Sequence, residues 1–110
     1  MGLRREEFGE EVASFQFVFQ LLDGSRRPVQ LRVGKPYMIS TIEWACPVEL
    51  NGLEPRYPDI RGGGSMQALS LALELIWRRL QDFLEKGGKV LDAENGSVYR
   101  LEDLRTLLSR

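Results

Sequence analysis

The chain has 110 residues, of which 43% are hydrophobic and 28% are charged, and its formal net charge at pH 7 is −1. This length and composition are typical of one globular domain and exclude a disordered chain. The near-neutral charge lacks the basic excess of nucleic-acid-binding domains, so we expect neither nucleic acid nor a membrane as partner. A single cysteine, Cys46, and a charged rather than apolar start of the chain favour a cytoplasmic protein.

Residues 1–11 form a charged N-terminal segment, a candidate flexible tail, and residues 12–110 are predicted to form one domain. Apolar and polar side chains alternate over residues 13–21, which is typical of a strand with one buried face. A second alternating run, residues 29–33, follows the turn Asp23-Gly24-Ser25. Two such runs across a short glycine-containing turn predict a β-hairpin.

A third strand is predicted over residues 37–50, where the alternate residues Ile42, Trp44 and Cys46 form one apolar side. Pro47 lies within this run and lacks a backbone N–H, so we expect a sheet edge or a bulge there. Asn51-Gly52 is a strong turn signal. Residues 54–61 contain two prolines and are predicted to return as a short edge strand ending at Ile60.

A long amphipathic helix is predicted from Ser65, a suitable N-cap, because apolar residues recur every three or four positions over residues 66–84. Gly87-Gly88 ends this helix, and residues 90–99 and 101–110 predict a second hairpin and a short amphipathic helix. The predicted fold class is α+β. We expect an antiparallel sheet of three to five strands with one face covered by the long helix, plus the short C-terminal helix.

Histidine is absent from the sequence, which excludes Ser-His-Asp and Cys-His mechanisms and every zinc site that uses imidazole. One cysteine cannot form an all-cysteine zinc or iron–sulfur site. Cys46 lies on the apolar parity of its strand, so we interpret it as a packing residue. We therefore predict a protein that is not an enzyme and has no metal or cofactor.

The start of the long helix is the first candidate site. Unpaired amides and the helix dipole attract anions, and glycines let the backbone approach a phosphate closely. The residues of this candidate anion site are Arg61, Gly62, Gly63, Gly64 and Ser65. The pattern is not that of a P-loop, and a flexible connector between sheet and helix explains the glycines equally well.

The second candidate is an interface formed by Leu71, Leu75 and Arg78, because the two leucines lie outside the main apolar stripe of the helix. The alternative, which we favour, is that the C-terminal helix covers both leucines within the monomer. A weaker candidate is a nucleic-acid site on the first hairpin, formed by Arg26, Arg27 and Arg32. The outward sheet positions offer no aromatic platform for bases.

Three motifs carry a resemblance to a known family, namely Trp44-Ala45-Cys46-Pro47, Asn51-Gly52-Leu53 and the stretch from Gly62 to Leu73. The chain resembles a bacterial family of uncharacterised small proteins that have a Trp-x-Cys strand and a Gly-x-Ser-x-Gln-Ala-Leu helix start. The similarity covers residues 29–84, and it implies an α+β fold without supplying an activity.

We predict a non-catalytic module that binds a protein partner or a second copy of itself, through the polar sheet face or the Leu71/Leu75 surface. The alternative is a small anion- or nucleotide-binding protein that uses the glycine-rich helix start. The weaker alternative is nucleic-acid binding by the first hairpin.

Overall fold

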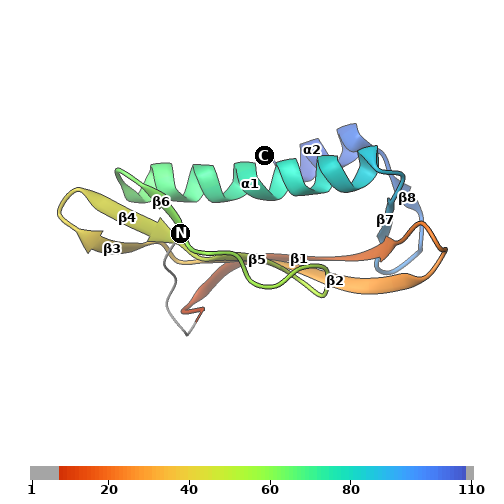
Figure 1. Cartoon of the computed structure of the whole chain (residues 1–110), viewed down its shortest axis with the longest axis horizontal. Helices are drawn as coiled ribbons and strands as arrows, with labels where there is room; N and C mark the ends of the chain where they lie inside the picture. The colour runs from red at the N-terminus through yellow and green to blue at the C-terminus, as the bar shows by residue number, and fades with distance from the viewer. Residues whose placement is uncertain (1–7, 109–110) are drawn as a thin grey trace.

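The computed structural model describes residues 8–108, which form an elongated α+β domain of 46 × 27 × 24 Å (Figure 1). Within this range the elements follow each other in the order β1 (Glu11–Gln20), β2 (Arg26–Gly34), β3 (Tyr37–Ser40), β4 (Glu43–Cys46), β5 (Val48–Asn51), β6 (Ile60–Gly62), α1 (Ser65–Glu85), β7 (Lys89–Asp92), β8 (Val98–Tyr99) and α2 (Leu101–Leu108).

Part of the expected flexible tail, residues 1–7, lies outside the described residues. The rest of the segment is packed on the domain. The Phe8 ring lies 4.2 Å from the guanidinium carbon of Arg32, and β1 already begins at Glu11.

The strands of the described region form two antiparallel sheets, with the orders β5-β2-β1-β7-β8 and β3-β4-β6. The predicted first hairpin is confirmed, because β1 pairs with β2 across the turn and Phe17 lies opposite Val29. The second hairpin is confirmed as β7 and β8, and β7 joins the first sheet by pairing with β1. The predicted α+β class is therefore correct, with two sheets where we expected one.

The predicted third strand is divided into three. The chain reverses after β3, so Ile42 lies in a hairpin turn rather than on a buried strand face. Pro47 then separates β4 from β5, because a residue without an N–H cannot continue the ladder. At this residue the chain passes from the smaller sheet to the larger one, and the Gly34 amide donates to the Pro47 carbonyl at 2.8 Å.

The prediction of a return strand over residues 54–61 is confirmed only at its end. Residues 53–59 have no strand structure, and β6 begins at Ile60, where the predicted strand should end. Pro55 and Pro58 explain the difference, because each removes a backbone donor that a strand would need. Only Ile60 and Arg61 of the predicted run belong to β6, which continues to Gly62 and pairs with β4 as an edge strand.

Helix α1 covers one face of both sheets (Figure 1). Its buried residues, Ala68, Ala72, Ile76 and Leu80, recur at four-residue spacing and pack against the strands. Two of these four are alanines, which lets the first half of the helix approach the sheets closely. Cys46 is fully buried in the same core, which confirms its interpretation as a packing residue.

The two ends of α1 differ from each other. Gly87 adopts φ +95°, and the amides of Gly87 and Gly88 donate to the Leu84 and Phe83 carbonyls, which is a Schellman motif and confirms the predicted end. The prediction of Ser65 as N-cap is wrong. Gly64 occupies that position in an extended conformation and makes no side-chain capping bond.

Helix α2 packs on α1 near its C-terminal half. Leu104 of α2 is fully buried, and the Arg105 guanidinium lies 5.7 Å from the Trp77 ring centre. The short C-terminal helix is thus confirmed, and Figure 1 shows it on the side of α1 away from the sheets.

Candidate interaction surfaces

The glycines before α1 serve close packing between strand and helix. A Cβ at Gly62 would lie 2.6 Å from the amide nitrogen of Ala68, so a larger residue would push the helix off β6. The Gly63 amide is already occupied, because it donates to the side-chain oxygen of Gln67. Glycine at position 62 is therefore explained by the close approach of the connecting segment to the helix. The Gln67 side chain caps the chain just before the helix.

Arg61 of the candidate anion site forms an ion pair. Its Nη1 lies 3.2 and 3.3 Å from the two carboxylate oxygens of Glu43, and both side chains are about one-third exposed. A shallow hollow beside this pair is lined by Ser40, Ile42, Glu43, Arg61, Gly62 and Gly63. The structure thus brings three of the five predicted anion-site residues together, but it adds a carboxylate that opposes a bound anion.

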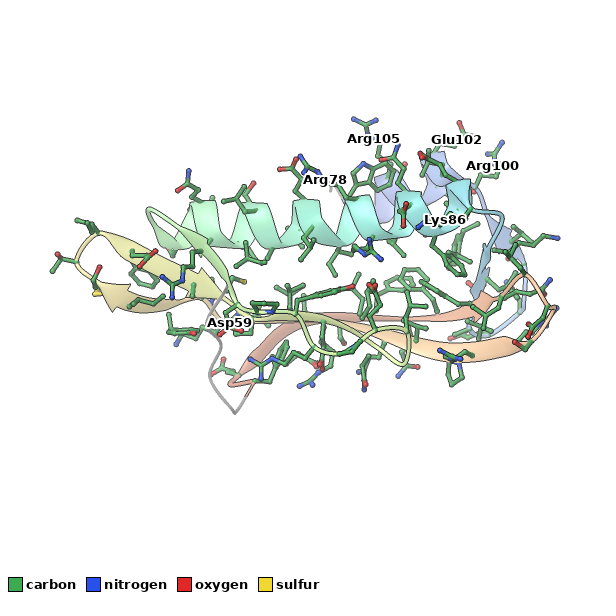
Figure 2. All side chains as sticks on the ribbon, in the orientation of Figure 1. Asp59, Arg78, Lys86, Arg100, Glu102 and Arg105 are labelled. Carbon is green, nitrogen blue, oxygen red and sulfur yellow. The ribbon has the colours of Figure 1, made fainter. Side chains whose placement is uncertain are left out.

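The residues of the predicted helix interface differ in their exposure. Leu71 is 38% exposed, whereas Leu75 packs against the core. Arg78 pairs with Glu74 at 2.6 Å, and Figure 2 shows Arg78 on the side of α1 that faces away from the strands.

The expectation that the C-terminal helix covers Leu71 and Leu75 is wrong. Helix α2 lies over Trp77, which is about 120° around the helix axis from Leu71. The loop between β5 and β6 is tied to α1 instead, at Arg79, one turn after Leu75.

This tie is a cluster of Glu54, Tyr57 and Arg79. Arg79 donates to both carboxylate oxygens of Glu54, and the Tyr57 hydroxyl donates to the same carboxylate. The Arg79 hydrogen bonds hold the pKa of Glu54 below its usual range, while burial raises the pKa of Tyr57. The cluster leaves Glu54 ionised and Tyr57 protonated, which suits a structural clamp.

A buried carboxylate, Asp59, lies beside the only thiol. It accepts hydrogen bonds from the Tyr37 hydroxyl at 2.5 Å and from Arg56 at 3.0 Å, and Figure 2 shows it at the level of the strands beneath α1. Burial, and to a lesser extent the Asp59 charge, raises the pKa of Cys46 to about 11. A thiol in this state is protonated near neutral pH and is a poor nucleophile.

The arginines of the first hairpin have different partners. Arg32 binds Glu11 at 2.7 Å and Glu49 at 2.5 Å, so two carboxylates neutralise it. Arg26 donates to the Gln20 side chain and Arg27 to the Gly52 carbonyl. The three arginines therefore do not act as one basic patch, which weakens the nucleic-acid hypothesis.

The largest departure from the sequence analysis is an apolar tip at the β3–β4 hairpin. Figure 1 shows this hairpin extending beyond the first turn of α1. Three large apolar side chains of β3 and the β3–β4 turn are exposed, and so is Met66 in the first turn of α1. We call these four residues the hairpin tip: Met38 (57% exposed), Ile39 (42%), Ile42 (79%) and Met66 (79%).

The sequence analysis missed this surface because it assigned Ile42 to the buried face of one continuous strand. The length of the predicted strand is the signal that would have revealed the turn. The predicted run of residues 37–50 is more than twice the usual strand length of about 5–6 residues, so a turn near its middle should have been expected. Ile39 adds to the exposure, since the register shifts between Met38 and Ser40, which is typical of a bulge.

Comparison with known proteins agrees with the resemblance in pointing to a family without an assigned activity. The family described as Domain of unknown function (DUF6968) matches residues 16–101, from the middle of β1 to the first residue of α2. No curated protein and no solved structure matches the chain. Among residues 8–108, no helix is long and apolar enough to cross a membrane. Because the match spans well over half of the chain, the protein belongs to the family Domain of unknown function (DUF6968).

Proposed function

We propose that the protein is a non-catalytic protein-binding module whose contact surface is the hairpin tip. The observation that carries this proposal is the exposure of four large apolar side chains at one end of the domain. Exposed apolar groups that gather in one place, rather than lying scattered, mark interaction sites on soluble proteins.

The base of the hairpin is held by strand pairing on both sides, which favours binding. Trp44 lies in the middle strand of the smaller sheet, opposite Met38 on one side and Gly62 on the other, and its ring packs against the core. A surface held in one conformation loses little entropy when a partner docks. The Arg61–Glu43 ion pair stands beside the tip and supplies the polar rim that protein interfaces usually have.

The chemistry of the described residues supports a non-catalytic role. The sequence has no histidine, and Cys46 is buried with its pKa raised to about 11. Over residues 8–108, no group of three or more cysteine, aspartate or glutamate side chains is arranged to hold a metal ion. We place the module in the cytoplasm, where a single free thiol stays reduced.

The test is site-specific crosslinking in cells that make the protein. A photoreactive amino acid at position 42 should crosslink to a partner protein, whereas the same group at Val98, which is half exposed and lies outside the hairpin tip, should not. With the purified partner, Ile42→Asp should weaken binding at least tenfold, because a carboxylate at the centre of an apolar contact must be desolvated. Unchanged affinity of Ile42→Asp for every crosslinked partner would refute the proposal.

A further inference from the structure

Strand β1 is paired along its whole length on one side but only near its end on the other. Its pairing with β2 runs from Glu11 to Gln20, whereas β7 reaches only from Phe17 to Gln20. Among the described strands, none pairs with residues 13–16 on this second side, and Figure 1 shows β7 at one end of β1. The larger sheet therefore has a gap, one strand wide, beside its central strand.

A hollow of about 360 Å³ lies at this gap, which we call the strand gap. It is lined by residues 14–16 of β1, by residues 92–94 at the end of β7, and by Tyr99. Residues 12–14 of β1 are exposed, although Phe17 further along the same strand is buried. The rest of the described domain thus leaves this half of β1 uncovered.

The backbone groups of Ser14 and Gln16 face the strand gap. In an antiparallel sheet, the N–H and C=O of successive residues point alternately to the two neighbouring strands. The Asp92 amide donates away from β1, toward the turn before β8, so Leu91 faces β1 and its partner Val18 faces β7. Ser14 and Gln16 lie four and two residues before Val18 and therefore face the same side. The backbone hydrogen bonds that residues 8–108 form outside regular strand pairing include none to Ser14 or Gln16.

We propose that the strand gap binds an extended segment of a partner protein, which adds to β1 as a further strand in line with β7. Free backbone donors and acceptors at a sheet edge match those of another extended chain, and strand addition is a recurring mode of peptide recognition. Residues 13–16 include neither a charge nor a proline, the features that usually protect an edge from pairing. The bulge between Glu11 and Ala13 limits the open stretch, so the bound segment is about four to five residues long.

The strand gap lies on the larger sheet, whereas the hairpin tip belongs to the smaller sheet and the start of α1. The two surfaces are therefore independent, and strand addition goes beyond the proposed function.

The two faces of the sheet decide which side chains the segment needs. Residues paired across neighbouring strands share a face, so a residue opposite Phe15 points to the helix side. Phe15 is partly buried there, packs against the core and lies 4.7 Å from the Phe17 ring centre. An apolar β-branched residue of the segment would cover it. Residues opposite Ser14 and Gln16 point to the uncovered face and should be polar.

The end of the gap next to β7 is acidic. Asp92 and Glu94 line it, and neither belongs to an ion pair with another residue of the range 8–108. Hydrogen bonds from the Asn95 amide and the Tyr99 hydroxyl lower the pKa of Asp92 and keep it ionised. The charge complement is a lysine or arginine at the end of the segment that meets β7. The partner segment thus alternates polar and apolar residues and has a basic residue at this end.

The first test is a selection of peptides on the immobilised full chain, with a phage library of random linear peptides as the probe. Enriched peptides should alternate polar and β-branched residues, include a lysine or arginine and lack proline. Ser14→Pro should weaken their binding about tenfold or more, because it removes an N–H that faces the gap. Ser14→Ala is the matched control and should keep the wild-type affinity, since it changes only an exposed side chain.

Ser14→Pro should fold, because the backbone of Ser14 does not face β2, and circular dichroism with the melting temperature checks this. A second variant keeps the test independent of β1. Glu94→Lys should weaken the binding of the selected basic peptides about threefold, whereas Glu85→Lys, at an exposed glutamate far from the gap, should not.

Amide hydrogen exchange, followed by NMR, locates the bound peptide. In the free chain the amides of Ser14 and Gln16 should exchange fast and those of Phe15 and Phe17, which face β2, slowly. A bound peptide should slow the exchange at Ser14 and Gln16 about tenfold or more.

Three results would overturn the proposal. Slow exchange at Ser14 and Gln16 in the free chain would show that the edge is already covered, by a second copy or by the chain itself. A library that enriches no peptide on the wild type relative to Ser14→Pro would show that the gap takes no strand. Peptides that bind without slowing these two amides would bind elsewhere.

Discussion

Arg79 donates two hydrogen bonds to Glu54, at 3.1 Å from Nε and 2.6 Å from Nη2, and thereby fixes the loop between β5 and β6 on helix α1. Residues 53–59 have no strand ladder to hold them, so side chains replace the missing backbone contacts. The Tyr57 hydroxyl donates to the same carboxylate. One ion pair with one phenol thus positions the segment that leads into β6.

Glu54→Gln should lower the free energy of unfolding by about 1–2 kcal/mol, because a charged acceptor with two arginine hydrogen bonds becomes neutral in a partly buried place. Urea denaturation measures this change. Glu85→Gln is the matched control, an exposed glutamate at the end of the same helix, and should change stability by less than about 0.5 kcal/mol. Equal effects of the two substitutions would show that the clamp contributes nothing.

The same pair predicts a pH dependence with a definite sign. The Arg79 hydrogen bonds lower the pKa of Glu54 in the folded state, so its contribution is fully present above the unfolded glutamate pKa of about 4.3. The contribution is lost as the pH falls through the lowered folded pKa. The stability difference between wild type and Glu54→Gln should therefore be constant from pH 7 to about pH 5 and shrink below the unfolded value. A difference that grows on acidification would contradict this assignment.

Gly62 and Gly64 should respond to substitution in opposite directions. Gly62→Ala should destabilise the protein by about 1–3 kcal/mol, because the new Cβ meets helix backbone at 2.6 Å. A Cβ at Gly64 meets open space in an extended conformation, and its N-cap position lacks a side-chain acceptor. Gly64→Ser should therefore stabilise the helix by about 0.5 kcal/mol. Thermal melts of the two variants decide the point.

The thiol of Cys46 should be unreactive in the folded protein. With its pKa raised to about 11, only about 0.1% of the group is thiolate at pH 8, and the side chain is fully buried. A thiol reagent should label the native chain at the rate of transient unfolding and label it rapidly in urea. Fast labelling without denaturant would contradict the buried position.

The anion hypothesis can be tested by freeing Arg61. In the wild type Glu43 neutralises this arginine, so phosphate should leave the melting temperature unchanged. Glu43→Gln removes the competing carboxylate, and phosphate should then raise the melting temperature, because the guanidinium lines a hollow beside Gly62 and Gly63 and would be left without its ion-pair partner. A phosphate-induced rise in the wild type would restore an anion-binding function.

The elements of this fold could be predicted where local signals agree. The alternation around Phe17 and Phe19 gave the buried face of β1, and the spacing of Ala72, Ile76 and Leu80 gave the buried face of α1. Gly87 and Gly88 ended the helix as expected, since a left-handed residue is a local requirement that glycine satisfies. Predictions based on one residue were less secure, and Ser65 failed as N-cap because Gly64 already occupies that position.

The sequence by itself determined the α+β class, the long helix, both hairpins of the larger sheet and the packing role of Cys46, because each follows from periodicity or from the backbone preferences of glycine and proline. Only the tertiary structure decided which apolar residues are left over. Ile42 and Leu22 are exposed because they stand in turns at opposite ends of the domain, where neither is covered by the rest of the fold. Pairing of Arg61 with Glu43 is likewise a contact between residues 18 positions apart, and no local pattern encodes it.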